Sequence, residues 1–293
     1  MQPTISVITP SFNQLDWLPL AIASVADQEQ VKCEHIVQDG GTRGIEESLR
    51  SQFNELTEKQ RLTIFVEKDA GMYDAINRGL AKSKGDICAC LNCDEQYLPG
   101  ALKSVAEFFD AHPQVDVLFG DVILVDARGC PISYRRSILP NSRHIHLAHL
   151  NTSSCATFFR KSVVERGFLF DTGWKAAGDA IWVDSLLRAK LQMAVLPRAL
   201  SVFTFTGDNL GASAISRAES RRLRQKSAEE SGPRSTAAVV LQHRLRKLLA
   251  GAYWSRRVRI EIYTLGSPDQ RQRFSRRVGF GWPRANPRAA GAT

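Results

Sequence analysis

The stretch ICACLNCDEQYLPGAL, residues 87–102, joins a short apolar run to a group of polar and acidic side chains. Ile87–Leu91 has the length and composition of a buried β-strand. The four residues that follow it at once are Asn92, Cys93, Asp94 and Glu95. Pro99 then stands where it can open a helix at its first turn. Two acids at the end of a buried strand either cap that helix or hold a ligand, and the other strand ends decide between these alternatives.

Strand-like and helix-like segments alternate on the N-terminal side of this stretch. The expected strands are Thr4–Thr9, Glu34–Gln38, Leu62–Glu67 and Ile87–Leu91. The expected helices between them cover residues 15–26, 44–59 and 72–84. Strands separated by helices of this length indicate βαβ units. We therefore predict an α/β fold with a Rossmann-like, mostly parallel sheet flanked by helices.

The four expected strands all end in polar sequence. The segments at these ends are TPSFN, QDGGT, EKDAG and LNCDE, and three of them carry acids. In a parallel sheet the carboxyl ends of the strands share one edge, where α/β proteins bind ligands. The chain has neither a GxGxxG nor a GxxxxGK[ST] loop, so the site expected at this edge is not a dinucleotide loop or a P-loop of those types.

Acidic side chains at such an edge suit a divalent cation and a polyphosphate. Mg²⁺ and Mn²⁺ prefer carboxylate oxygens and commonly share their coordination with substrate phosphates. Asp94 or Glu95 would hold such an ion, which would stabilise the charge on a leaving diphosphate. Asp39, before Gly40 and Gly41, either accepts hydrogen bonds from a base or ribose or closes an ordinary Asx turn. The residues alone leave both alternatives open.

Four motifs occur together in the order and spacing of a known enzyme family. They are ISVITPSFNQ, VQDGGT, EKDAGMYDAINRGLAKSKGDI and LNCDEQYLPGAL. Over residues 4 to about 210 the chain resembles the family 2 glycosyltransferases, which have the GT-A fold. GMYDAINRGL and LNCDEQYLPGAL look most like the branch that builds bacterial exopolysaccharide and colanic-acid-type repeat units. The resemblance implies an inverting transfer of a sugar from a UDP- or GDP-sugar donor to a glycan or lipid-linked acceptor in surface polysaccharide synthesis.

The resemblance also assigns roles to residues at the strand ends. The residues that would bind the donor are Pro10, Ser11, Asn13, Asp39, Asp69, Asn92 and Cys93. Asp39 would contact the base or ribose, and Asp69 would be a second acid on the nucleotide side. Asn92–Cys93–Asp94 takes the place of the family's DxD motif, so Asp94 would be the ligand of Mn²⁺ or Mg²⁺. Because Asn92 replaces the first acid of that motif, one metal contact would be weaker.

An inverting transfer needs a base that takes the proton of the attacking hydroxyl. The family places an Asp at the start of a helix in its second half. Asp179 in KAAGDAIWVDSLLRA matches this place, and Asp184 is the second choice. The other interpretation of Asp179 is an N-cap for the helix that runs to Ala189.

Two departures from the family pattern keep an alternative function open. Gly178 stands where relatives more commonly have an acid, and Ser154–Cys155 stands where relatives of this branch often have His-Gln. The nearby His144, His146 and His149 would either compensate for this change or be solvated surface histidines, and we favour the second alternative. If the departures abolish chemistry, the chain would be a catalytically impaired sugar-nucleotide-binding relative that acts as an interaction protein.

The pattern along the chain indicates two parts. We expect a glycosyltransferase domain over residues 1–214, with a nucleotide-sugar half (1–112) and an acceptor half (113–214). Residues 215–293 are expected to form a basic helical extension with a disordered end. The chain is 43% hydrophobic and 24% charged, as is usual for a globular protein. It starts without a charged-then-apolar leader, so we expect a cytoplasmic protein.

Positive charge is concentrated in the extension. Residues 215–293 carry 18 Lys/Arg against 5 Asp/Glu, a net charge of +13, whereas residues 1–214 have a net charge of −4. Residues that share one helical stripe within 239–253 are Leu241, Leu245, Leu248, Leu249 and Ala252. Such a helix suits an anionic membrane surface, so residues 215–260 are expected to place the protein on the inner face of the cytoplasmic membrane. The alternative is a helix packed on the catalytic domain with its arginines in solvent. No nucleic-acid-binding motif accompanies the charge, so we expect no nucleic-acid partner.

Overall fold

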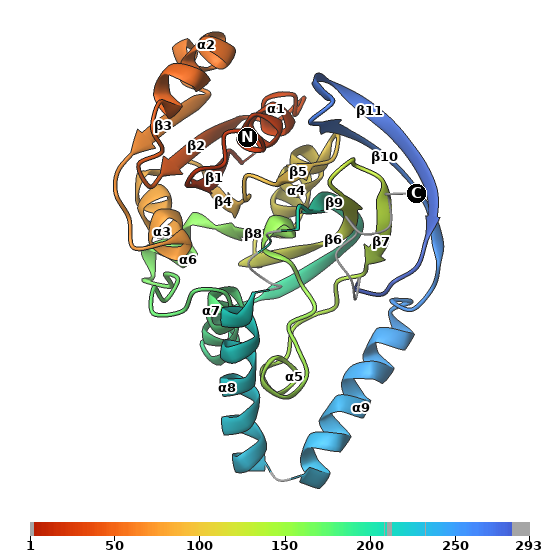
Figure 1. Ribbon diagram of the computed structural model, residues 1–293. Coiled ribbons are helices and arrows are strands. Elements are labelled where there is room, and N and C mark those ends of the chain that lie inside the picture. Colours follow the sequence, from red (N-terminus) through yellow and green to blue (C-terminus); the bar gives the residue numbers. More distant parts are fainter. Residues whose placement is uncertain (1–2, 208, 210–212, 232, 283–293) are drawn as a thin grey trace.

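A curled central sheet lies between helices in the computed structural model, and two long helices and a β-hairpin complete the molecule (Figure 1). The structure describes residues 3–207, 209, 213–231 and 233–282. The first half contains β1 (Ile5–Ser11), α1 (Leu18–Ala26), β2 (Cys33–Asp39), α2 (Ile45–Glu58), β3 (Leu62–Val66), α3 (Met72–Lys82), β4 (Ile87–Cys90), β5 (Glu95–Tyr97) and α4 (Ala101–Ala111). The second half contains β6 (Val117–Asp126), β7 (Pro131–Arg135), α5 (Ser142–Leu147), the 3₁₀ helix η1 (Ser154–Ala156), β8 (Thr157–Arg160), α6 (Lys161–Glu165), α7 (Gly178–Arg188), β9 (Met193–Phe205), α8 (Ala214–Ser231), α9 (Pro233–Leu249), β10 (Arg256–Thr264) and β11 (Ser267–Val278).

The predicted α/β architecture is confirmed. The strands of the main sheet run in the order β3-β2-β1-β4-β8-β6-β9-β5, and β7 pairs with β6. The strands β3, β2, β1 and β4 are parallel, as the βαβ pattern predicts. In the rest of the main sheet only β6 and β9 pair in parallel among the described strands, whereas β8, β7 and β5 pair antiparallel with their neighbours.

Helices cover both faces of the sheet because each has one apolar side. On one face α1 and α4 bury residues such as Ala21, Leu102 and Phe109 in a core with β1, β4 and β6. On the other face α3 and α7 bury Ile76, Leu80 and Trp182 against the same strands. With both faces covered, the open edge of the parallel strands is the place left for a ligand.

Strand register brings the predicted polar ends level with one another. Ser11 at the end of β1 lies opposite Asp39 at the end of β2, and Asp39 lies opposite Val66 at the end of β3. On the other side of β1, Ile8 pairs with Cys90, the last residue of β4. The four polar segments therefore share one edge of the sheet, which we call the donor edge.

The C-terminal extension is only half helical, which differs from the helical extension expected from the sequence. The helices α8 and α9 are followed by the β10–β11 hairpin. The reason lies in the alternation of β10, where Val258, Ile260 and Ile262 are buried and the residues between them are not. Their side chains form a core with β6, β7 and β9. The end expected to be disordered, residues 283–293, lies outside the described part of the chain.

One arginine fastens the hairpin to the body. Arg271 of β11 donates two hydrogen bonds to the carboxylate of Asp27, at 2.5 and 2.8 Å, and further bonds to the carbonyls of Ser24 and Tyr97. In Figure 1 the hairpin runs up beside the sheet, while α8 and α9 project below it with α5 between them. Within the described residues, no helix is long and apolar enough to cross a membrane.

Candidate active site

The segment after β4 places a carboxylate at the donor edge. The Cys93 thiol donates to the carbonyl of Pro10 (3.3 Å), so this segment is tied to the end of β1. Asn209 donates its side-chain amide to Oδ2 of Asp94 (2.8 Å) and also to the carbonyl of Thr204 (2.8 Å). Asp94 is therefore held between the end of β4 and the segment after β9. Asn209 thus brings the segment after β9 to the predicted metal ligand.

Glu95 lies beside Asp94 but faces the protein interior. Its Oε2 accepts the backbone N–H of Asn92 (2.8 Å), whereas its buried Oε1 has no hydrogen-bond partner among the described residues. Burial raises the pKa of both carboxyl groups, and the charge of Asp94 raises the pKa of Glu95 further. Two ionised carboxylates this close repel each other, so a cation beside Asp94 would favour the ionised form of both.

Asp39 organises the turn after β2. Its Oδ1 accepts the backbone N–H groups of Gly41 (2.9 Å) and Thr42 (2.5 Å), and its Oδ2 accepts the Thr42 hydroxyl (2.8 Å). The Thr42 hydroxyl oxygen also accepts the backbone N–H of Asn13 (2.7 Å). Asp39 is fully buried and acts as an Asx turn, which is one of the two alternatives the sequence left open. Its contact with a base or ribose stays a prediction.

Asp69 closes the donor edge from the segment after β3. Its Oδ1 accepts the backbone N–H of Gly71 (2.8 Å). A Cβ atom at Gly40 would lie 2.9 Å from Asp69 Oδ2 and 3.2 Å from the Phe12 ring. Gly40 is therefore required for Asp69 to lie against the β2 turn. Phe12, which is 60% exposed, was missed as a site residue although it stands in TPSFN.

Asp179 lies at the start of α7, as the family resemblance implies. Its backbone N–H donates to the hydroxyl of Tyr73 on α3 (3.2 Å), and its Oδ1 accepts the N–H of Ala180 (2.8 Å). A Cβ atom at Gly178 would lie 2.5 Å from the Tyr73 ring. The missing acid before Asp179 therefore has a physical cause, because the Tyr73 ring occupies the space that its side chain would need.

A small cavity beside α7 contains the Asp179 side chain. The residues that line it are Cys90, Leu150, Thr152, Ser154, Thr157, Phe159, Phe170, Asp179, Trp182 and Val183. Burial raises the pKa of Asp179 to about 6. Cys90, the last residue of β4, also lines this cavity, so the cavity lies at the end of the strand that precedes Asp94. Ser154 of the Ser154–Cys155 pair lines the cavity, and the buried thiol sulfur of Cys155 accepts the Ser201 hydroxyl (3.3 Å).

Asp184, the second candidate base, is occupied elsewhere. Its Oδ2 lies 3.0 Å from His146 Nε2 and 2.8 Å from Arg188 Nε, and its Oδ1 accepts the Ser142 hydroxyl. Burial acts to raise its pKa, but the bonds from these three partners lower it below the ordinary value. The geometry favours Asp179 as the base because Asp184 links α7 to α5 and does not line the cavity.

The histidines that precede Ser154–Cys155 in the sequence have structural partners. His144 is buried, so it is not the solvated surface histidine that the sequence favoured. The rings of His144 and His149 pack against His243 of α9, with centroids 4.9 and 4.7 Å apart, and do not line the cavity.

Glu219 of α8 is a site residue that sequence reasoning missed. Its carboxylate accepts the backbone N–H groups of Lys175 (2.8 Å), Ala176 (2.9 Å) and Ala177 (2.8 Å). These are the residues directly before α7, so Glu219 holds the loop that positions Asp179 at the start of this helix. No local signal marks Glu219 in the sequence, since it lies 40 residues after Asp179 in an Arg-rich helix.

The donor set fits a divalent cation shared with a ligand. Among the described residues, no group of three His, Cys, Asp or Glu side chains could by itself hold a metal ion. Asp94 supplies a carboxylate, and Asn92 has a neutral side-chain oxygen two residues earlier. One or two protein carboxylates completed by substrate phosphates are the usual magnesium arrangement in nucleotide sites. Asp94 and Asn92 are therefore the residues that would hold the ion.

Comparison with known proteins agrees with this arrangement. The family model of glycosyl transferase family 2 matches residues 6–168. A PGL/p-HBAD biosynthesis glycosyltransferase of Mycobacterium tuberculosis is 32% identical over 123 residues, which are 42% of this chain and 48% of that protein. An uncharacterized glycosyltransferase of M. tuberculosis is 31% identical over 197 residues, which are 64% of this chain and 70% of that protein. The chain thus spans about half the length of the first of these relatives.

Solved structures share the fold. The mannosyltransferase PcManGT from Pyrobaculum calidifontis, in complex with GDP-Man and Mn²⁺, has a TM-score of 0.60 at 18% identity, over 85% of this chain and 71% of that chain. Residues 1–349 of Staphylococcus aureus TarS, in complex with UDP-GlcNAc, give a TM-score of 0.56 at 17% identity, over 84% of this chain and 73% of that chain. With the predicted GT-A fold confirmed and the family model matched over more than half of the sequence, the chain belongs to glycosyl transferase family 2.

Proposed function

We propose that the protein is an inverting, metal-dependent glycosyltransferase that moves a sugar from a UDP- or GDP-sugar to a glycan or lipid-linked acceptor in bacterial surface polysaccharide synthesis. The observation that carries this proposal is the grouping of Asp39, Asp69 and Asp94 along the donor edge, with Asp179 in a cavity that Cys90 at the end of β4 also lines. Solved neighbours in complex with UDP-GlcNAc and with GDP-Man and Mn²⁺ support the donor class.

The donor would lie along the ends of β1, β2 and β4. Pro10, Ser11 and Asn13 come directly from β1 and its end, and Gly40 and Gly41 let the backbone approach a nucleotide closely. Asp39 would act mainly by holding that turn in shape, with its carboxylate beside the ribose. Asp94 and the side-chain oxygen of Asn92 would hold Mn²⁺ or Mg²⁺, which supplies stabilisation of the diphosphate charge when bound.

Asp179 would act as the base. In the transfer, a bond forms between the acceptor oxygen and the anomeric carbon while the bond from that carbon to the diphosphate oxygen breaks, and the hydroxyl proton passes to the Asp179 carboxylate. A pKa of about 6 leaves Asp179 ionised at neutral pH while keeping it a stronger base than an exposed Asp. The cavity beside it, lined by Thr152, Ser154 and Trp182, has a volume of about 20 Å³, so only the attacking hydroxyl group of the acceptor would enter it.

The position in the cell follows from the acceptor class. A lipid-linked acceptor would place the protein in the cytoplasm, on the inner face of the cytoplasmic membrane. No nucleic-acid partner is proposed for the basic extension. The alternative, a catalytically impaired binding relative, predicts donor binding without transfer.

A donor panel tests the proposal. Thermal unfolding is measured with UDP- and GDP-sugars, each with and without Mn²⁺, for the full chain and for Asp94→Asn. We expect one donor to raise the unfolding midpoint more with Mn²⁺ than without it, and we expect Asp94→Asn to remove that difference. Release of the nucleoside diphosphate is measured in parallel. If no donor stabilises the protein more with metal, the proposed metal-diphosphate site is wrong.

A further inference from the structure

Helix α9 turns its leucines away from the protein. Four of them recur at spacings of one to four residues and form one stripe, which we call the leucine face. Their exposed fractions are 59% for Leu241, 50% for Leu245, 51% for Leu248 and 88% for Leu249. The sequence predicted the stripe, and the structure shows that the catalytic domain does not cover it. A contiguous group of exposed leucines on one helix is unusual for a surface that faces only water.

The opposite side of α9 is buried although it carries polar and cationic groups. The buried residues of α9 include His243 and Lys247, and only Val239 among them is apolar. The Lys247 ammonium lies 5.4 Å from the centre of the Tyr253 ring. Burial lowers the pKa of Lys247 to about 8, with a further contribution from Arg135. A helix that served only to pack on this body would bury leucines and expose the lysine. The observed orientation keeps the leucine face available to a partner.

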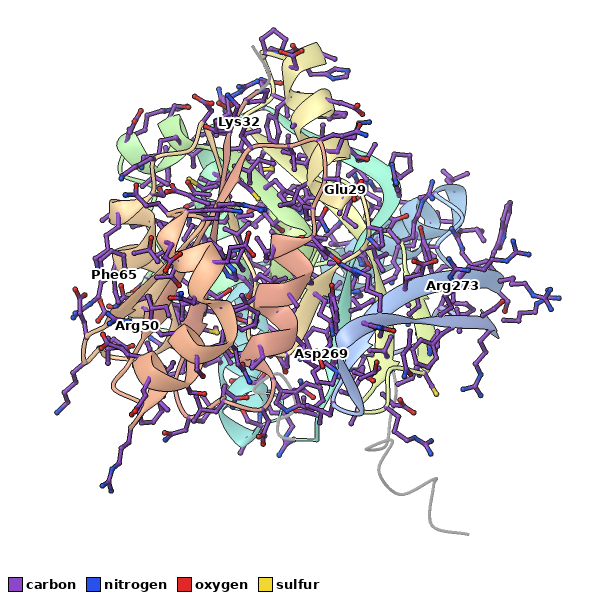
Figure 2. The ribbon with its side chains drawn as sticks, turned by 90° about the horizontal axis from the view of Figure 1, so that it is seen from above. Glu29, Lys32, Arg50, Phe65, Asp269 and Arg273 are labelled. Carbon is purple, nitrogen blue, oxygen red and sulfur yellow. The ribbon has the colours of Figure 1, made fainter. Side chains whose placement is uncertain are left out.

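Positive charge accompanies the leucine face. Among the side chains of α8 and α9 that the structure describes, the exposed arginines are Arg217, Arg221, Arg222, Arg224 and Arg244. The two helices contact each other and project together below the sheet (Figure 1). Arg273 of the hairpin is also exposed (Figure 2), but it pairs with Glu261 (2.7 Å) and belongs to a different part of the surface. Exposed leucines flanked by arginines are the combination that a helix lying on an anionic bilayer presents.

We propose that the leucine face of α9, flanked by the arginines of α8 and α9, docks onto an anionic lipid bilayer. This deepens the proposed function and rests on it, because such docking would hold the catalytic domain beside a lipid-linked acceptor. A second copy of the chain fits the face less well, since it would bring together two extensions that each carry a net charge of +13. Anionic headgroups neutralise this charge, and the boundary of the acyl region accepts the leucines.

Vesicle flotation of the full chain tests the docking. One set of vesicles contains phosphatidylcholine only, and the other contains in addition about 30% phosphatidylglycerol. We expect binding to the anionic vesicles that weakens as salt is added, and much weaker binding to the neutral ones. The double variant Leu245→Ser/Leu248→Ser should bind at least about tenfold more weakly. Leu265→Ser, an exposed leucine in the β10–β11 turn, is the matched control and should bind like the unchanged protein.

Two further measurements keep the outcomes separate. Because both substituted leucines are exposed, the thermal unfolding midpoint of the double variant should equal that of the unchanged protein. Asp94→Asn should still float with anionic vesicles, so a wrong donor site and a wrong docking surface give different results. The proposal is overturned if the unchanged chain does not float, or if the double variant floats equally well. It is also overturned if light scattering shows a dimer that the leucine substitutions dissociate, because a second copy would then cover the face.

Discussion

The substitution Asp179→Asn tests catalysis and stability separately, because it replaces one carboxylate oxygen with an amide nitrogen. Asparagine has nearly the same shape as aspartate, and its side-chain oxygen can still accept the N–H of Ala180. It cannot take a proton from the acceptor. Loss of a general base lowers the rate by about a hundredfold to ten-thousandfold, so we expect transfer to fall by at least about a hundredfold.

The same substitution should make the protein more stable at neutral pH. Burial raises the pKa of Asp179 from 3.8 to about 6, so the ionised carboxylate disfavours the folded state. A difference of this size corresponds to about 3 kcal/mol in the free energy of unfolding at pH 8. Because Asp179 keeps some contact with solvent, we expect about 2 kcal/mol, or about 4 °C in the unfolding midpoint.

The sign of the pH dependence follows from the raised pKa. The penalty is absent below the ordinary pKa of 3.8, grows as the pH rises, and is complete above about 6. The stabilisation by Asp179→Asn should therefore be about half as large at pH 5 as at pH 8. For the unchanged enzyme, kcat/KM should rise through an apparent pKa of about 6.

The measurements are thermal unfolding at the two pH values and release of the nucleoside diphosphate from the donor identified by the panel. Asp110→Asn, an exposed carboxylate near the end of α4, is the control and should change neither quantity. A variant that is less stable than the unchanged protein at pH 8 would refute the burial argument. Transfer at the normal rate would show that another group is the base, with Asp184→Asn as the next variant.

Three further substitutions test the supporting structure. Glu219→Gln should lower kcat by about tenfold with little change in the donor KM. It should also lower the apparent pKa on the acidic side of the pH profile, because a looser loop lets water reach Asp179. Glu107→Gln on the exposed side of α4 is the control. Gly178→Glu should lower the free energy of unfolding by about 1–3 kcal/mol because its side chain meets the Tyr73 ring, as thermal unfolding would show. Arg271→Ala should cost about 2 kcal/mol because it removes the hydrogen bonds to Asp27, Ser24 and Tyr97, although Tyr263 still donates to Asp27. A variant with an unchanged midpoint would show that the hairpin is held by apolar contacts alone.

The donor edge could be predicted from the sequence because its signals are local. The sequence of each βα unit predicts its own strand, and polar segments follow the predicted strand ends at Thr9, Gln38, Glu67 and Leu91. Parallel pairing then places these ends together whatever the details of packing. Asp39 shows the limit of such reasoning, since its carboxylate is occupied by its own turn, which residue type alone does not reveal.

Long-range contacts account for what the sequence did not show. Asn209 reaches Asp94 across 115 positions, and Arg271 reaches Asp27 across 244. The Arg-rich character of the extension also hid the alternation of Val258, Ile260 and Ile262 that makes β10 a strand. The leucine stripe of α9 was predicted, but the sequence does not show which side of α9 packs against α5, and this contact decides where the stripe points.

The contacts of the extension bear on whether residues 1–214 can act as a separate catalytic domain, as the sequence suggests. Removal of α8 would take away Glu219 and leave the backbone N–H groups of residues 175–177 without their acceptor. Removal of the hairpin would expose the apolar side chains of β6, β7 and β9 that now pack on β10. A chain ending at residue 214 would therefore lose both the support of the base and part of its core. The extension therefore supports the candidate active site. The leucine face lies on α9, the helix that follows α8 and its Glu219. Docking of α9 on a membrane would then act on the helix that packs against α8, and Glu219 of α8 accepts hydrogen bonds from the loop before Asp179.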